Sequence, residues 1–432
     1  MSLTSSTGST GSTRSRVHQR SFIPRGILPA AMLSLLLIAP VWSPPAAATE
    51  AAATDAAPSA GALHAGTSAA AGPELGSKAF WRLPASVDVG MVFRTWGITE
   101  PTGDSDLSQL AMPIHLHGRL RGDLDYSCLF QVATSNLDYQ GGDSNSLSGP
   151  TDSKLSLTYY VPDSRFSVGA GLRVPTGESE LDGGEENVAR VLIDRMLGFH
   201  VKRYGEGTDL ELRAGFADAR GPEFAYAAGV SYLFKGSFDV RFQAGDGLAS
   251  YDPGNELSAF GAARMRLGAR RLDASVRLIS FSVDRRDGNE ELEEGRQLSL
   301  TGGLTQEMLR GTAEVLAEGV LKDDTVVFGG GEELSPIRDV GGNILRLSGG
   351  FRGRLDRRTA LGGRVSLSWF GETDAGTGDG FLFEAGPSFK RTLGQGLALR
   401  AEWLLLTGNA EQNTIDLGGQ AISIGFALGG TP

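Results

Sequence analysis

The sequence predicts an all-β protein, a transmembrane, antiparallel, up-and-down β-barrel. Three observations predict it: apolar residues recur at every second position along most segments beyond residue 81, long and short polar links alternate between these segments, and the non-apolar face carries charges of both signs. A bilayer-spanning barrel combines these features because its strands alternate lipid-facing and lumen-facing residues, with tight turns at one end and long loops at the other. The segments between links give about 16 strands, and a miscounted pair would give about 14 or 18.

The composition restricts the remaining classes of protein. The chain has 432 residues, 61 of them glycine, and its hydrophobic fraction is 40%. A formal net charge of -11 argues against a nucleic-acid partner, because phosphate binding relies on clustered Lys and Arg. The one cysteine, Cys128, excludes an intramolecular disulfide framework. No motif indicates a cofactor.

The N-terminal region predicts export. Four arginines precede a short apolar stretch, Ile27 to Trp42, and small residues follow at 46–48. This order is typical of a secretory signal peptide, which we assign to residues 1–48. Residues 49–80 are mostly Ala, Gly, Ser and Thr and predict a disordered periplasmic leader. The barrel is expected to occupy residues 81–432.

The alternation of strands and links predicts the topology in the membrane. In the segment Leu124 to Val132 every second residue is apolar, and polar residues fill most of the gaps. Long links are expected at 97–107, 137–150 and 175–207, among others, and tight turns lie between them. Both termini fall on the tight-turn side, which is periplasmic in bacterial outer-membrane barrels. We therefore expect a multi-pass outer-membrane protein in contact with lipid and lipopolysaccharide, inserted by the barrel-assembly machinery.

The charged positions on the non-apolar face predict a hydrated lumen. The candidate pore-lining residues are Arg264, Arg266, Arg277, Arg346, Arg352, Arg364, Arg400, Glu211, Glu314, Glu318, Glu384 and Glu402. Charges of both signs facing an opening set the field across it and hence its selectivity. Aromatic residues near strand ends predict interfacial girdles; these are Trp81, Trp96, Trp369 and Trp403.

Three local patterns suggest further sites. His115 and His117 are two apart on one strand, so they share a face; they are either polar lumen residues or part of a metal site that needs more ligands. Apolar residues within 185–199 have approximate helical spacing, which predicts a short helix in the longest link, placed either in the barrel mouth or over its rim. The acidic link 284–294 is either solvated loop charge or a binding place for divalent cations at lipopolysaccharide.

A segment near the middle of the barrel resembles a known family. The run Gly171, Leu172, Pro175, Thr176 and Gly177 matches the Gly-Leu-x-x-Pro-Thr-Gly turn that ends a strand in the phenol-degradation and FadL-like group of outer-membrane transport barrels. The run Leu155 to Gly177 as a whole, Tyr232 to Gly236 and Tyr251 to Glu256 are similar as well. These matches are short and together cover about a quarter of the barrel. The resemblance implies a transport barrel whose cargo is a small hydrophobic or aromatic solute.

Three functions are compatible with these patterns. The first is a channel or transporter that passes a small solute through a charged lumen. The second is a non-conducting structural or adhesive barrel whose lumen is filled by its own side chains. The third is a barrel hydrolase or protease, but the chain has no Gly-x-Ser-x-Gly motif, and we expect that the protein is not an enzyme.

Overall fold

In the computed structural model, the described residues are 14–16, 85–101, 103–142, 144–240, 249–328, 342–371, 379–394, 396–410 and 414–429. The predicted leader, nearly all of the predicted signal peptide, and Trp81 lie outside them. Within the described residues, no helix is both long enough and apolar enough to cross a membrane.

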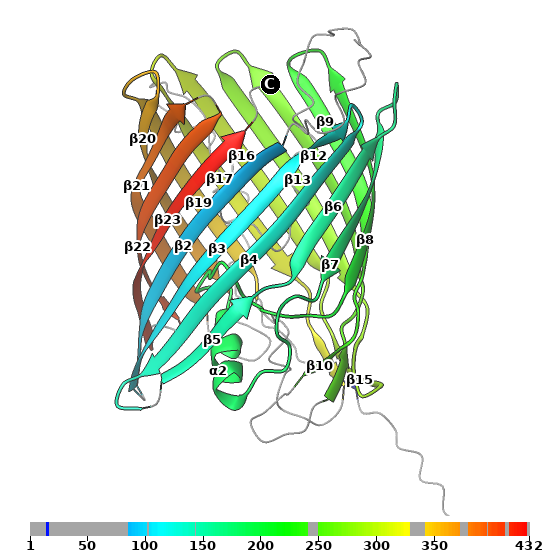
Figure 1. The fold of residues 1–432 in the computed structure, drawn as a ribbon, viewed down its shortest axis with the longest axis vertical. Helices are drawn as coiled ribbons and strands as arrows, with labels where there is room; N and C mark the ends of the chain where they lie inside the picture. The colour runs from blue at the N-terminus through cyan, green and yellow to red at the C-terminus, as the bar shows by residue number, and fades with distance from the viewer. Residues whose placement is uncertain are drawn as a thin grey trace, which may run out of the picture.

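The strands close into one antiparallel barrel (Figure 1). In chain order they are β2 (Ala85–Glu100), β3 (Gly103–Arg121), β4 (Leu124–Tyr139), β5 (Ser144–Pro150), β6 (Ser153–Tyr160), β7 (Phe166–Val174), β8 (Asp209–Arg220), β9 (Phe224–Phe234), β12 (Glu256–Leu267), β13 (Arg270–Phe281), β16 (Gln297–Met308), β17 (Gly311–Lys322), β19 (Ile344–Arg354), β20 (Thr359–Phe370), β21 (Gly380–Gly394), β22 (Leu397–Ala410) and β23 (Ile415–Gly429). The last strand pairs with the first, from Ser86 opposite Gly429 to Thr99 opposite Asp416. The barrel has 16 strands, as the sequence predicts.

One of these strands is interrupted. The second half of β4, toward Tyr139, pairs with β5, and the first half pairs with β6. The strands β5 and β6 therefore occupy one position in the barrel. Thr151 and Asp152 lie between the two halves and are both buried. The interruption changes which residues face inwards: odd-numbered positions such as Leu147 in β5, and even-numbered positions such as Ser156 in β6. A bulge of this kind re-aims side chains without ending the sheet.

The outer face of the barrel is apolar and exposed. Large hydrophobic side chains that face away from the lumen include Val230, Leu257 and Leu278, with exposed fractions of 52%, 53% and 47%. A contiguous surface of this kind is covered by lipid in a transmembrane barrel. Trp369 and Trp403 also belong to the exposed outer face. Near the tight turns the rings of Phe166 and Phe216 lie 5.3 Å apart within a group that also contains Phe224 and Tyr226.

The girdle prediction is wrong for Trp96. Its exposed fraction is 1%, and it lies in the apolar core inside the barrel. The reason is strand parity. Even-numbered positions of β2, including Asp88 and Arg94, face the lumen, whereas the exposed Val89 and Met91 face outwards.

The links differ at the two ends of the barrel. The tight turns, the start of β2 and the end of β23 lie at one end of the barrel, at the top in Figure 1. The longer links lie at the opposite end, which we call the loop end. The first two loop-end links are shorter than predicted, because β2 and β3 extend to residues 100 and 103 and β4 and β5 to 139 and 144. The alternation itself agrees with the prediction.

Several longer links and one strand from the predicted signal-peptide region, β1, form a small second sheet at the loop end. Its strands, in spatial order, are β1 (Arg14–Arg16), β18 (Val326–Phe328), β15 (Asn289–Glu293), β14 (Asp284–Arg286), β11 (Ala249–Asp252) and β10 (Phe238–Val240). Asp284 is completely buried there, where it accepts hydrogen bonds from the Tyr251 hydroxyl and from the Gly254 N–H at 2.7 Å. Asp284 therefore has a structural role and does not contribute to an exposed acidic surface.

Candidate functional site

The candidate site is the barrel lumen. Strand parity places all twelve predicted pore-lining residues on the inward face; for example, Arg277 lies between the outward Val276 and Leu278, and Arg364 precedes the outward Val365. The twelve are Arg264, Arg266, Arg277, Arg346, Arg352, Arg364, Arg400, Glu211, Glu314, Glu318, Glu384 and Glu402. Their role in conduction stays a prediction.

Many of the inward charges form ion pairs across the barrel wall. Arg346 and Glu318 are direct neighbours on β19 and β17, with Nη1 and Oε2 3.6 Å apart. Arg364 on β20 reaches past β21 to Glu402 on β22, at 3.6 Å, because the inward position between them is Gly386. These four side chains have exposed fractions between 22% and 31%. Solvent therefore reaches this part of the inward face.

Not every inward cation has a carboxylate opposite it. Lys390 and Arg400 are direct neighbours on β21 and β22, and Arg352 lies on the inward face of β19. Like charges placed directly opposite each other repel. The wall formed by β19 to β22 therefore has a locally positive stretch toward the tight-turn end.

The longest link, residues 175–208, folds back into the loop-end mouth, and we call it the insert. Its helix α2 (Gly183–Leu192) begins at Asp182, whose carboxylate accepts the Glu185 N–H while the Glu185 carboxylate accepts the Asp182 N–H. This capping box defines the start of a helix. The helix prediction is confirmed, but the helix starts earlier and ends sooner than the range 185–199.

The insert packs inside the barrel and does not cover its rim. Its helix α2 lies at the loop end beside β5 (Figure 1), and its apolar residues form one buried cluster with inward side chains of the surrounding strands. The insert contributes Val188, Leu192, Met196, Leu197, Phe199, Val201 and Tyr204, and the barrel contributes Trp96, Ile98, Leu107, Ala111, Ala133, Leu137, Leu147, Phe370, Leu382, Leu404, Leu406, Leu417 and Ala421. All these barrel residues belong to β2–β5 and β20–β23. The insert therefore occupies one side of the mouth.

Arg94 connects the turn that follows α2 to the barrel wall by hydrogen bonds. Its Nη1 donates to the carbonyl oxygens of Leu197 at 2.6 Å and Gly198 at 2.8 Å, and its Nη2 pairs with Glu384 at 2.7 Å. Trp96 Nε1 donates to the same Leu197 oxygen at 2.8 Å. Gly198 has a φ of +58°, and a Cβ there would meet Arg94 Nη1 at 2.3 Å, so this turn requires glycine. We call these five residues the Arg94 latch.

A second set of hydrogen bonds holds the following segment. The Gln109 amide pairs with both backbone groups of Val201, accepting from its N–H at 2.8 Å and donating to its carbonyl at 2.7 Å. Gln109 also donates to Ser135 Oγ, which contacts the Tyr204 hydroxyl at 3.0 Å, and that hydroxyl donates to Leu147 O. Burial raises the pKa of the Tyr204 hydroxyl to about 12. These buried polar groups are satisfied, so the segment has a defined position.

The two ends of the insert cross at a tight neck. A Cβ on Gly177 would lie 1.7 Å from the Tyr204 carbonyl oxygen, so only glycine fits there. The carboxylate of Asp152, at the strand interruption, accepts the N–H groups of Gly177 at 3.1 Å and Glu206 at 2.7 Å. Thr176 Oγ1 donates to the Thr151 carbonyl at 2.7 Å. The Pro-Thr-Gly segment thus marks the point where the chain leaves the wall and enters the mouth.

The Glu206 carboxylate adds charge to this neck. It forms ion pairs with Arg173 at the end of β7 and with Arg203 in the insert. Burial alone raises the pKa of Glu206, but the nearby positive charges of Arg203, Arg173 and Lys235 outweigh this effect and hold the pKa well below its usual range. Glu206 is therefore ionised at neutral pH.

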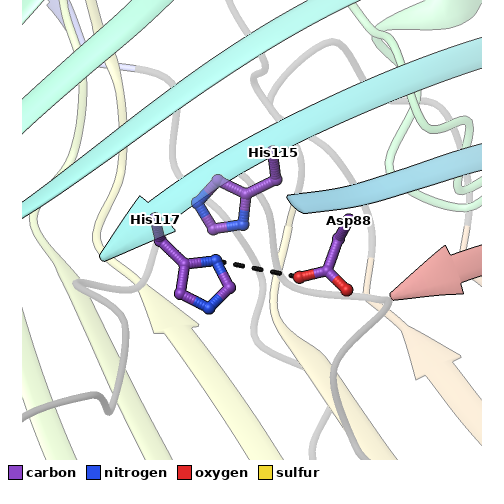
Figure 2. Close-up of side chains that lie close together, drawn as sticks. All are labelled: Asp88, His115 and His117. Atoms are coloured by element: carbon purple, nitrogen blue, oxygen red, sulfur yellow. Dashed lines mark ion pairs between the residues drawn. The ribbon is translucent and has the colours of Figure 1, made fainter. Parts of the chain in front are cut away.

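The predicted histidine pair acquires a third member in the structure. His115 and His117 lie on the inward face of β3, and Asp88 on β2 lies beside them (Figure 2). His117 Nδ1 is 3.7 Å from Asp88 Oδ2, and His115 Nε2 is 2.7 Å from Ser127 Oγ on β4. Sequence analysis did not identify Asp88, because its register opposite His115 depends on the exact length of the preceding turn.

No family model and no curated protein matches the chain. Among solved structures, OpdL of Pseudomonas aeruginosa has 11% identity and a TM-score of 0.43 over 80% of this chain and 99% of that one. OccK7 (OpdD) of the same organism has 11% identity and a TM-score of 0.41, with 80% and 99% covered. The COG4313 outer membrane channel from Pseudomonas putida F1 has 15% identity and a TM-score of 0.34, with 59% and 98% covered.

The assignment as a closed barrel rests on the strand pairing of this chain. The assignment as a membrane protein rests on its exposed apolar outer face.

Proposed function

We propose that the protein is an outer-membrane channel through which small hydrophilic solutes diffuse passively. One observation carries this proposal: inward-facing charges such as Arg346, Glu318, Arg364 and Glu402 keep solvent exposure, while the insert covers apolar inward residues nearer the loop end. An exposed, charged inner wall stabilises water and ions in a barrel lumen. The insert narrows the loop-end mouth, and the charged wall beside it is the path for solute.

The distribution of charge supports a preference for anions. Arg352, Lys390 and Arg400 lie on the inward face near the tight-turn end, and Lys390 and Arg400 are direct neighbours. An opening lined by excess positive charge raises the local concentration of anions. This preference decreases as salt concentration rises, because salt screens exposed charges beyond about 8 Å at physiological ionic strength.

The cargo class implied by the resemblance is a separate proposal. The Gly171 to Gly177 segment supports a small hydrophobic or aromatic solute as in the phenol-degradation and FadL-like group. The described lumen gives this cargo less support, because its apolar inward cluster near the mouth is already covered by the insert. A small hydrophilic anion agrees better with the exposed part of the wall.

The orientation in the membrane follows from the link lengths. We propose that the tight-turn end, where β2 begins and β23 ends, faces the periplasm, and that the insert and the second sheet face the exterior. Lipid and lipopolysaccharide would contact the outer face, and the barrel-assembly machinery would insert the chain.

Enzymatic activity has one feature in its favour, the contact between Ser127 Oγ and His115 Nε2. Two features argue against a hydrolase. The carboxylate in this cluster, that of Asp88, forms an ion pair with His117, at 3.7 Å. Ser127 is also in the middle of a paired strand, where backbone N–H groups belong to the sheet and do not form an oxyanion hole.

Conductance in planar bilayers tests the channel proposal. We expect discrete current steps from the purified protein, with a reversal potential that indicates anion preference in a salt gradient. Replacing Lys390 and Arg400 by glutamine should shift that potential toward cations, whereas the same replacement of Arg220, in a tight-turn region, is the matched control. A barrel that inserts into lipid but passes no current would instead support the non-conducting alternative.

A further inference from the structure

Two histidines and one aspartate converge on the inward face of the first β-hairpin (Figure 2). Asp88 on β2 is directly opposite His115 on β3, and His117 follows on the same face. One potential ligand atom from each residue can be chosen so that all three lie within 4.8 Å of one another. Because paired strands fix the positions of the Cβ atoms, this arrangement requires no movement of the backbone.

We propose that Asp88, His115 and His117 bind a divalent transition-metal ion, represented by Zn²⁺, on the lumen wall near the tight-turn end. The donor set selects the class of ion. Imidazole nitrogens favour zinc, copper and nickel, whereas calcium and magnesium prefer oxygen ligands alone. Two imidazoles and one carboxylate are also a protein ligand set of zinc sites that keep an open fourth position. The bound ion would therefore expose one coordination position to the lumen.

The distances agree with this ion. Two ligand atoms that each lie 2.0 to 2.1 Å from a tetrahedral zinc ion are about 3.3 Å apart. His117 Nδ1 and Asp88 Oδ2 are 3.7 Å apart. The third ligand atom lies within 4.8 Å of the other two, so it has to move closer by at most about 1.5 Å to meet the same geometry, which side-chain rotation provides. The side chains of His117 and Asp88 are 44% and 39% exposed, so the cluster borders the lumen.

The surroundings of the cluster support metal binding over a purely structural ion pair. His117 Nδ1 is buried and has no hydrogen-bond partner among the residues that the structure describes. His115 Nε2 contacts Ser127 Oγ at 2.7 Å, and with the proton on Nε2 the lone pair lies on Nδ1. Metal-binding histidines are commonly oriented by such a contact through the second nitrogen. The neighbouring Arg119 is paired with Asp125 at 2.7 Å and does not compete for Asp88.

Isothermal titration of the full-length barrel in detergent with Zn²⁺ tests this proposal. We expect one saturable site per chain. The replacements Asp88→Asn, His115→Gln and His117→Gln should each lower the Zn²⁺ affinity by at least about 100-fold, and Ser127→Ala by about 10-fold, in line with the effect of losing a group that orients a ligand. His200→Gln, outside the cluster, is the matched control and should keep the wild-type affinity.

Two results would overturn the proposal: the absence of saturable Zn²⁺ binding, or wild-type affinity in His117→Gln. Circular dichroism of each variant in detergent verifies that the barrel is folded, and a variant that does not fold is replaced by its alanine counterpart. The visible spectrum of bound Co²⁺ gives a second readout. It should indicate low coordination number in the wild type and disappear in the His115→Gln/His117→Gln double variant. Neither measurement depends on conduction, so the site can fail while the channel proposal stands, and the reverse also holds.

Discussion

Removing the Arg94 side chain should release the turn of the insert that follows α2. In Arg94→Ala, the carbonyl oxygens of Leu197 and Gly198 lose a charged donor, and Glu384 loses the cation 2.7 Å away. The exposed fractions of the Arg94 and Glu384 side chains are only 12% and 11%, so solvent replaces little of this interaction. Breaking a buried pair by removing one partner costs about 3 to 5 kcal/mol.

The loss of this interaction lowers the free energy needed to open the turn locally. The rest of the insert stays in place, because the packing of Val188 and Leu192 against the wall remains. At about 1.4 kcal/mol per factor of ten, the open population should rise by at least about 100-fold. Amide hydrogen exchange should therefore accelerate by that factor at residues 194–199, and single-channel current should become noisier.

A matched control separates the latch from a general effect of losing an arginine. Arg264 pairs with Asp273 at 2.6 Å on β12 and β13, which contribute nothing to the insert cluster, so Arg264→Ala should leave exchange in the insert unchanged. The double variant Arg94→Ala/Glu384→Ala should recover part of the protection, because it removes the unpaired carboxylate. Wild-type exchange at 194–199 in Arg94→Ala would refute this reasoning.

Three further predictions concern other parts of the site. Gly177→Ala should displace the insert and increase its hydrogen exchange, because its Cβ would overlap the Tyr204 carbonyl; Gly418→Ala, where a Cβ meets open space, should not. Glu206 has a lowered folded-state pKa, so its stabilisation of the neck is complete above about pH 4.5 and is lost as pH falls toward that lowered value. Thermal unfolding of Glu206→Gln should therefore differ from wild type at pH 7 and converge with it in acid. A serine-reactive fluorophosphonate should leave Ser127 unlabelled, and labelling that requires His115 would instead support a hydrolase.

The sequence predicts the barrel well because its signals are local. Strand parity and the alternation of tight and long links can be recognised from the sequence without the tertiary structure. They predict the number of strands and the inward orientation of residues such as Arg364 and Glu402. The apolar spacing in the longest link likewise predicts α2, and the Asp182 and Glu185 pair defines where it begins.

The contacts between the insert and the wall are not local, and sequence analysis missed them. Arg94, Gln109 and Ser135 occupy inward positions like those of other lumen residues, and nothing in their segments indicates that they bind the insert. Trp96 is aromatic and near a strand end, which predicts a girdle position, but its even number in β2 places it with Asp88 on the inward face. Parity was the better guide at that position.

Cysteine accessibility in lipid vesicles tests most directly whether the polar face meets water and the apolar face meets lipid. In a Cys128→Ser background, Arg264→Cys and Arg364→Cys should react with a membrane-impermeant, water-soluble thiol reagent. Met265→Cys and Val365→Cys, one residue away on the outward face, should react only after the lipid is removed. Equal labelling of the two faces in intact vesicles, or labelling of the outward pair alone, would contradict the proposed barrel in the membrane and the channel function that depends on it.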